Sequence, residues 1–466
     1  MKRIVMGVVG LLCCLGVTAH AAEGQPVVPD LAKIKVLDLK TAQKLALAGN
    51  PDIAAAQARI EQARARVRQA AATWWPSLDA SGAGARQRLS DNSFQTTKDL
   101  YSRFGMATDQ TTENYSANLQ ATWLLFDGFA RNFKEQQARY GEQAADAGLL
   151  DSRRLLVTSV AEAFLNAQLA QTTIDINRAD ETFYSRQLED AQNRFKVGAG
   201  PWGDVLNIKV QVNSARTSLI RSQREFEAAG YGLAALLGLP EAAFPAHLRL
   251  ESLDKETTIA EQKESADALI KEALAARPDI RRLEMAVKQA EAATGAAKAP
   301  FYPKVQLAGA VEGVREGDAR LNNDDFGNTV GMNMSWNLYA GGADKARLIE
   351  AEQAKREAAY TLAGLRNGVA AEVRQDLALL AAAQEQLRLQ RETVKLVEEN
   401  RDLAKNEYEA GEASLVRLNE AQRDLITTYS RLAQALAGYQ LAQQRLFSAT
   451  GRNLAGFDPL AQAKGK

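Results

Sequence analysis

The chain has 466 residues, of which 46% are hydrophobic, and its 57 basic side chains balance its 57 acidic ones. This length suits several ordinary domains or one long repetitive one. Because the formal net charge is zero, there is no electrostatic reason to expect a nucleic acid or another acidic polymer as partner.

A secretory signal is predicted over residues 1–22. Lys2 and Arg3 provide its positive charge, an apolar run follows, and Ala19-His20-Ala21 matches a small-residue cleavage site. We expect cleavage just after this motif, at Ala21 or Ala22, which places the mature chain outside the cytoplasm.

Few chemistry-bearing residues remain in the mature chain. Both cysteines, Cys13 and Cys14, lie inside the signal, and Leu12 does not fit the small residue that a lipid-attachment site needs before its cysteine. The remaining histidine is His247, beside Pro245, and we interpret it as an ordinary loop residue. Cys/His metal clusters are thereby excluded, and we expect no metal site, no cofactor and no enzymatic activity.

The rest of the chain consists of two copies of one unit. The segment 46–53 recurs as 273–280, an offset of 227 residues, and Trp74-Trp75-Pro76 meets Phe301-Tyr302-Pro303 at the same offset. Self-similarity at a fixed spacing is the mark of a repeat architecture. We therefore predict a duplicated structural unit.

Further along the chain the offset falls to 213 residues, because Trp123 meets Trp336 and Gly198 meets Gly411. The first copy therefore carries a connecting segment that is 14 residues longer, and an exposed loop tolerates such a difference best. We divide the mature chain into a first repeat (23–238), a linker (239–265), a second repeat (266–452) and a C-terminal tail (453–466).

Each copy is predicted to contain a long helical hairpin, at about 128–238 and 341–450. No proline falls between 77 and 200 or between 304 and 457, and proline breaks helix interiors. As a helix, the stretch 128–197 would span roughly 105 Å. In the return helices, seam positions alternate at three and four residues from Val205 to Leu236 and from Leu418 to Ala449, which is typical of a coiled coil.

Four segments alternate apolar and polar residues with a period of two. The clearest is 115–126; 304–312 and 329–338 follow, and the Gly- and Ala-rich 78–85 is the weakest. Strands of this length with one apolar face are typical of proteins that cross a membrane with strands. After the signal there is no stretch of about 20 apolar residues, so no transmembrane helix is predicted.

Large aromatic residues gather at the helix-proximal ends of these segments, where a membrane-surface girdle is expected; they are Trp74, Trp75, Trp123, Phe301, Tyr302 and Trp336. Four strands cannot close a barrel, and an open sheet edge is not viable in lipid. Two chains would give a filled interior, whereas three would leave an aqueous lumen. We therefore predict a homotrimer in contact with outer-membrane lipid.

At this point the sequence resembles the TolC-type family of outer-membrane efflux ducts. The resemblance rests on motifs that recur in both halves: Arg277-Pro278-Asp279-Ile280 with Tyr302-Pro303, the helix starts Phe126-Asp127-Gly128 and Tyr339-Ala340-Gly341-Gly342, and the turns Arg194-Phe195-Lys196-Val197-Gly198 and Tyr408-Glu409-Ala410-Gly411. It implies a mainly α fold with a small transmembrane β contribution. Long antiparallel coiled-coil helices and four strands per chain then form, as a trimer, a twelve-stranded barrel and a helical periplasmic tunnel.

The same resemblance implies a passive duct in the outer membrane of a Gram-negative bacterium, extending into the periplasm. Its partners would be a periplasmic adaptor and an inner-membrane pump, in a tripartite efflux or type I secretion system that exports small molecules or proteins. The motifs identify neither the cargo nor the class of pump.

The turns that end the two long helices form the periplasmic tip in this family, whose entrance carries an aromatic residue and paired acids. By resemblance the aromatic falls on Tyr408, and the two acids fall on Arg417 and Glu420, so one acid is replaced by a base. Asp204 and Glu412 add negative charge nearby. We expect ion pairs of Arg417 with these acids to hold the tip closed; the alternative is solvated turn charges of little energetic weight.

Two other classes of protein stay open from the sequence alone. One is a structural or adhesive coiled-coil protein of the periplasm, in which the alternating segments form a soluble sheet. The other is a periplasmic adaptor, although adaptors place one helical hairpin among other modules and this chain has two hairpins. Detergent dependence and a heat-sensitive trimer distinguish the duct from a soluble rod.

Overall fold

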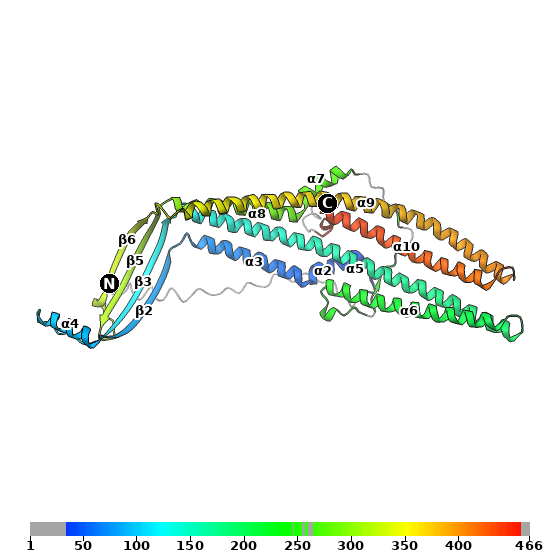
Figure 1. The fold of residues 1–466 in the computed structure, drawn as a ribbon, viewed down its shortest axis with the longest axis horizontal. Helices are drawn as coiled ribbons and strands as arrows, with labels where there is room; N and C mark the ends of the chain where they lie inside the picture. The colour runs from blue at the N-terminus through cyan, green and yellow to red at the C-terminus, as the bar shows by residue number, and fades with distance from the viewer. Residues whose placement is uncertain (1–33, 246, 254–256, 260–263, 458–466) are drawn as a thin grey trace.

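The computed structural model describes residues 34–245, 247–253, 257–259 and 264–457. Figure 1 shows an elongated molecule with a small sheet at one end and the turns of two helical hairpins at the other. The predicted signal (1–22) and most of the predicted tail lie outside the described residues.

The same order of elements occurs twice along the chain: two helices, a strand hairpin and a helical hairpin. The first half contains α2 (Leu39–Gly49), α3 (Pro51–Ala72), β2 (Ser77–Arg88), β3 (Thr111–Phe126), α5 (Ala130–Lys196) and α6 (Trp202–Leu236). The second half contains α7 (Ala266–Ala276), α8 (Pro278–Ala297), β5 (Lys304–Glu316), β6 (Phe326–Ser335), α9 (Ala343–Glu409) and α10 (Leu415–Thr450). The predicted fold class, mainly helical with four long strands, is confirmed, and the structure adds two strands of two residues each.

The two longest helices, α5 and α9, have 67 residues each and so extend roughly 100 Å. Gly198 and Gly411 adopt positive φ angles, which lets the chain leave each helix and reverse direction. α6 then runs back along α5, and α10 along α9 (Figure 1). Among the described residues, no helix combines the length and apolar character needed to span a bilayer.

The seam predicted for α10 is confirmed, because all ten positions from Leu418 to Ala449 are buried. In α6 only six of the ten predicted positions are buried. The difference follows from the neighbours: α10 packs against both α9 and α5, whereas α6 has α5 as its main helical neighbour. One side of α6 is therefore left uncovered in a single chain.

The four long strands form one antiparallel sheet in the order β2-β3-β5-β6. β2 and β6 are therefore its two edges, and each has a strand neighbour on one side only. Three of the strands are longer than the alternating segments predicted, and β2, the weakest prediction, is regular over 12 residues. The prediction of a strand from 329 to 338 is wrong at its end, because β6 stops at Ser335. The side chain of Asn337 accepts a hydrogen bond from the backbone N–H of Tyr339, and this Asx-type turn ends the extended backbone.

The longer connection predicted in the first copy contains a helix that the sequence did not indicate, α4 (Asp91–Ser102). Ser90 caps it by accepting a hydrogen bond from the N–H of Ser93. α4 has no buried residue, and it lies beyond the strand ends, at the opposite end of the molecule from the hairpin turns (Figure 1).

The linker between the copies lies against the middle of α5. β4 (Arg249–Leu250) pairs in parallel with β1 (Val36–Leu37), and Gln171 of α5 both donates to and accepts from the backbone of Leu250. His247 lies exposed in a turn. The remaining short elements are 3₁₀ turns: η2 (Pro240–Ala242), η3 (Ala299–Phe301), η4 (Asn323–Asp325) and η5 (Arg452–Leu454).

Candidate functional site

The sheet has one apolar face and one polar face. Large hydrophobic side chains on its apolar face are exposed in the single chain; they include Leu78, Leu119, Trp123, Val311, Val330, Met332 and Met334. The register places small and polar residues on the other face, such as Ser81 beside Asn118 and Thr122 beside Ala308. Such a division suits a sheet with lipid on one side and water on the other.

The predicted girdle residues all lie where the helices meet the strands. Trp123 in β3 donates its indole N–H to the carbonyl of Trp74 at 3.0 Å, and Trp74 donates to the carboxylate of Glu135 at 2.9 Å. Trp75, Phe301, Tyr302 and Trp336 lie outside the strands and are exposed. Their place at a membrane surface stays a prediction.

A residue that the sequence analysis missed holds this junction together. Arg131 is 6% exposed, and its guanidinium donates to the carbonyls of Thr73, Leu124 and Leu125 at 3.3, 2.6 and 3.0 Å. It lies 4.4 Å from the centre of a Trp74 ring. Asp127, one helical turn earlier, pairs with it at 3.5 Å. The i, i+4 spacing of Asp127 and Arg131 at a helix start was a signal in the sequence. The bonds of Arg131 to backbone carbonyls left no such signal.

At the other end of the molecule the predicted tip residues are spread over three helices and one turn. Asp204 lies in the first turn of α6, Tyr408 in the last turn of α9, Glu412 in the turn between α9 and α10, and Arg417 and Glu420 in α10. The structure brings Tyr408 against the first hairpin, where its ring lies 5.4 Å from the guanidinium of Arg194. The two hairpins therefore touch near their turns.

The prediction that Arg417 pairs with Asp204 or Glu412 is wrong within the single chain. Its guanidinium lies 4.0 Å from the carboxylate of Glu407 and donates to the amide oxygen of Asn400 at 3.3 Å. Both partners are on α9, whose end faces the start of α10 across a short turn. The pairing is thus within one hairpin and does not include Asp204 or Glu412. A gating role for the tip residues stays a prediction.

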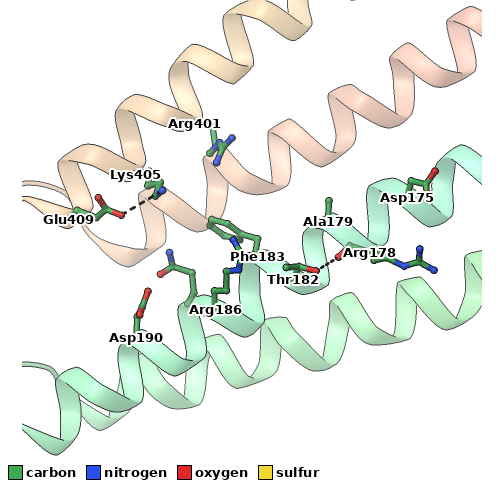
Figure 2. A pocket seen from close by; sticks show the side chains of 11 residues that line it. Asp175, Arg178, Ala179, Thr182, Phe183, Arg186, Asp190, Arg401, Lys405 and Glu409 are labelled. Atoms are coloured by element: carbon green, nitrogen blue, oxygen red, sulfur yellow. Dashed lines mark hydrogen bonds and ion pairs between the residues drawn. The ribbon is translucent and has the colours of Figure 1, made fainter. Parts of the chain in front are cut away.

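A groove of about 540 Å³ lies between α5 and α9 (Figure 2). Its lining is mostly charged: Asp175, Arg178, Arg186, Asp190, Arg401, Lys405 and Glu409, together with Ala179, Thr182, Phe183 and Gln187. On α5 these residues recur every three or four positions, and on α9 every four, so the sequence did contain a signal for it. That α5 and α9 lie on the two sides of one groove could not be read from that spacing.

Between the two hairpins, α5 and α10 are joined by a partly buried hydrogen bond. Gln422 of α10 is buried and donates to the carboxylate of Asp180 on α5 at 2.9 Å. Burial raises the pKa of Asp180 above its ordinary value, and the bond from Gln422 only partly offsets this. A carboxylate here therefore carries an uncompensated desolvation cost when it is charged.

Asp180→Asn is expected to raise the free energy of unfolding at pH 7. Because its pKa is raised in the folded chain, Asp180 binds a proton more tightly there than in the unfolded chain. Its contribution to the free energy of unfolding therefore falls as the pH rises from the ordinary pKa of aspartate to the raised pKa of the folded chain. Asparagine keeps the acceptor for Gln422 and has no charge to desolvate. Urea unfolding between pH 4 and 8 should show a smaller fall in the variant than in the native chain. The exposed Asp175→Asn is the control; an unchanged pH slope in Asp180→Asn contradicts the expectation.

In the described part of the chain no group of three or more His, Cys, Asp or Glu side chains is arranged to hold a metal ion. The features described above are instead surfaces: a two-faced sheet, a charged groove and a pair of hairpin turns.

Comparison with known proteins agrees with this arrangement. The chain is 25% identical over 428 residues to the cation efflux system protein CusC of Escherichia coli strain K12, covering 89% of this chain and 86% of that protein. It is 26% identical over 410 residues to the toluene efflux pump outer membrane protein TtgC of Pseudomonas putida, covering 85% and 78%.

Solved structures share the fold. The outer membrane protein VceC of Vibrio cholerae superposes with a TM-score of 0.72 at 21% identity, covering 89% of this chain and 96% of that one. The family model described as outer membrane efflux protein matches residues 42–239 and 269–452, which is most of the chain and includes both hairpins and all four long strands. The chain therefore belongs to the outer membrane efflux protein family.

Proposed function

We propose that three copies of this chain form an outer-membrane duct through which an efflux system exports its cargo across the periplasm and the outer membrane. One observation carries the proposal: a four-stranded sheet with two free edges continues directly into helices roughly 100 Å long. Unpaired backbone is not tolerated in lipid, so the sheet has to be closed by other copies. Three copies supply enough strands for a water-filled lumen.

The duct acts passively. The polar face of the sheet lines the lumen, the apolar face meets lipid, and the helical hairpins continue the conduit into the periplasm. No step requires a nucleophile, a metal or a cofactor from this chain. The energy for export comes from an inner-membrane pump to which the duct is coupled.

The names of relatives favour small cargo. CusC is named for cation efflux, one TtgC protein for toluene efflux, and ArpC of Pseudomonas putida for antibiotic efflux. These cargoes share small size and little else. We therefore propose export of small molecules rather than secretion of proteins, with the pump rather than the duct selecting the cargo.

A periplasmic adaptor is the proposed partner, and the charged groove between α5 and α9 is the surface that we propose for it. The groove carries Arg178, Arg186, Arg401 and Lys405 among its acids, so a complementary pattern of charges on a helical partner would fix both its register and its orientation. It lies on the long helices near the hairpin turns (Figure 2), the end that faces the pump in the proposed arrangement.

The alternative is a soluble coiled-coil rod or adaptor, and the sheet argues against it. Val330, Met332 and Met334 are exposed in a row on β6, and a soluble protein seldom exposes a continuous apolar face of this kind. Purification decides between them: a detergent-dependent trimer that forms pores in lipid bilayers supports the duct, whereas a water-soluble monomer without pore activity rules it out.

Arg417→Ala is expected to raise the single-channel conductance in planar bilayers. The substitution removes the contacts of the Arg417 guanidinium with Glu407 and Asn400 and so loosens the start of α10 beside the hairpin turn. Arg417 is half exposed and its ion pair is long, so the effect on overall stability should stay below about 1 kcal/mol. Arg388→Ala, which removes an exposed arginine farther up α9, is the control, and equal conductance in all three proteins contradicts a gating role.

A further inference from the structure

The connection between β2 and β3 carries an apolar surface that is open in the single chain. Along α4 and into the turn after it, Phe94, Thr97, Tyr101 and Phe104 follow one another at steps of three and four residues, with Leu100 beside them. This spacing places them on one face of a helix. α4 has no buried residue, and the side chain of Phe104 is 73% exposed. The opposite face of α4 is polar and carries Asn92, Gln95 and Asp99.

This surface belongs to the segment that distinguishes the first copy from the second. The connection in the second copy, 317–325, has Leu321 as its one large apolar residue. In the first copy the base of the connection is fastened. The backbone N–H of Leu89 donates to the carbonyl of Gln110 at 2.9 Å, and the Gln110 side chain donates to the carboxylate of Asp91 at 2.6 Å. α4 therefore starts from a fixed point at the outer ends of β2 and β3, the ends away from the long helices.

The apolar face of the sheet indicates where the hydrocarbon of the membrane would end. At the outer ends of the strands, aromatic rings on this face cover glycines of the neighbouring strand. A Cβ on Gly84 would lie 3.1 Å from the ring of Tyr115, and one on Gly313 would lie 2.7 Å from the ring of Phe326. From Trp123 to Tyr115, β3 covers roughly 27 Å along the strand, or about 20 Å of depth at the usual barrel tilt. With the rings at both ends, this matches an apolar band of about 25 Å.

α4 begins just outside this boundary. Ser90, its capping residue, lies roughly 20 Å along the strand beyond Gly84, which is about 15 Å of depth at the usual barrel tilt. The chain turns between β2 and α4, so the helix runs across the direction of the strands and does not continue it (Figure 1). α4 is therefore at the depth of the headgroups and sugars of the outer leaflet.

The charges near α4 also suit a lipid surface. Arg86 lies on the apolar face of the sheet, where its side chain is 74% exposed and its ion pair with Glu113 is long, at 3.6 Å. Lys98 lies at the border between the two faces of α4, with its ammonium 5.9 Å from the centre of the Phe94 ring. From Arg86 to Met106 the chain has four basic residues and two acidic ones. Basic residues that flank an apolar helix face are attracted to the phosphate groups of anionic lipids.

We propose that α4 is an interfacial helix, whose apolar face and Phe104 insert among the lipids of the outer leaflet while its polar face meets the external water. The inference rests on the proposed placement of the sheet in the membrane and adds a second lipid contact to it. The lumen is the less suitable neighbour for this face. The side of the sheet that lines the proposed lumen is polar and offers α4 no apolar surface, whereas the lipid-facing side continues the apolar surface of α4.

A fluorescent label on single cysteines tests this placement. The chain's two cysteines, Cys13 and Cys14, lie in the predicted signal, so the mature protein offers no competing thiol. Leu100→Cys and Gln95→Cys place a bimane label on the apolar and the polar face of α4, in vesicles of phosphatidylethanolamine and phosphatidylglycerol. The quenchers are a phospholipid with a spin label on its headgroup, and iodide in the water. The ratio of lipid quenching to iodide quenching should be several-fold higher at Leu100 than at Gln95, its matched control.

Two outcomes overturn the interfacial helix. Equal quenching by iodide at the two sites places α4 in water. Protection of the Leu100 label from both quenchers shows that protein covers this face, as it would if the α4 helices of neighbouring copies met over the mouth of the duct.

A third labelled site separates this inference from the proposed duct. Val311→Cys lies on the apolar face of β5, and its label should be quenched by a phospholipid that is spin-labelled in its acyl chain. A label at Val311 that escapes this lipid defeats the proposed duct itself. A quenched label at Val311 together with a label at Leu100 that is open to iodide defeats only the interfacial helix.

Discussion

Arg277→Ala is expected to lower the free energy of unfolding of the helical part by about 3–5 kcal/mol, which is typical of removing one partner from a buried ionic network. Arg277 is 5% exposed. Its guanidinium holds Asp279 with two hydrogen bonds, at 3.1 and 2.7 Å. It also donates to Glu372 of α9 at 2.6 Å and to the carbonyl of Ala449 at the end of α10 at 3.1 Å. Urea unfolding followed by helical circular dichroism in detergent measures the loss.

The cost arises chiefly at Asp279, which stays buried when Arg277 is removed. Burial acts to raise the pKa of Asp279, but the hydrogen bonds and charge of Arg277, together with the charge of Arg154 and the backbone N–H of Ile280, outweigh it and hold the pKa below its ordinary value. In the native chain this carboxylate therefore stabilises the fold above the ordinary aspartate pKa, and the contribution is lost as pH falls through the depressed pKa. In Arg277→Ala the carboxylate can be protonated at higher pH, so the destabilisation should be smaller at pH 4 than at pH 7.

The control for Arg277→Ala is Arg374→Ala, which breaks an exposed ion pair of α9 with Asp267. Exposed pairs contribute about 0–1 kcal/mol, so this variant should unfold nearly as the native chain does. If Arg277→Ala lowers the free energy of unfolding no more than Arg374→Ala does, the contacts of Arg277 do not hold the helices together.

The long helices and the sheet could be predicted because their signals are local and periodic. The absence of proline between 304 and 457 permitted a helix of the length of α9. The alternation of apolar and polar residues indicated each strand of the sheet, because successive side chains of a strand point to opposite faces whatever its neighbours are. α4 was missed because Ser, Thr and Asn fill much of it, and these are weak helix formers.

The contacts that join the elements could not be predicted, because they depend on residues far apart in the sequence. Asp180 and Gln422 are 242 positions apart, and neither stands out in its own helix. The pairing of Arg417 with Glu407 is closer in sequence, but it too could not be predicted, because it depends on how the turn between α9 and α10 folds. The contacts of Arg131 could not be predicted either, because three of its acceptors are backbone carbonyls, which every residue has and no sequence pattern identifies.

Arg131→Ala is expected to open the junction between the first strand hairpin and α5, with a local loss of about 3–5 kcal/mol. The substitution leaves the buried carboxylate of Asp127 without its ionic partner. It also leaves the carbonyls of Leu124 and Leu125 without their donor, at about 1–3 kcal/mol for each group that stays buried. Hydrogen exchange should speed up at the end of β3 and the start of α5 and remain unchanged at the hairpin turns.

The comparison with Arg131→Lys separates charge from geometry at this junction. A lysine ammonium retains the charge beside Asp127, but it lacks the planar fork that reaches several carbonyls at once, so this variant should fall between alanine and the native chain. Arg139→Ala, which removes an exposed arginine paired with Glu135 two turns farther along α5, should leave the exchange rates as they are. If Arg131→Ala exchanges no faster than Arg139→Ala, the junction is held by the packing of its aromatic rings and not by the guanidinium.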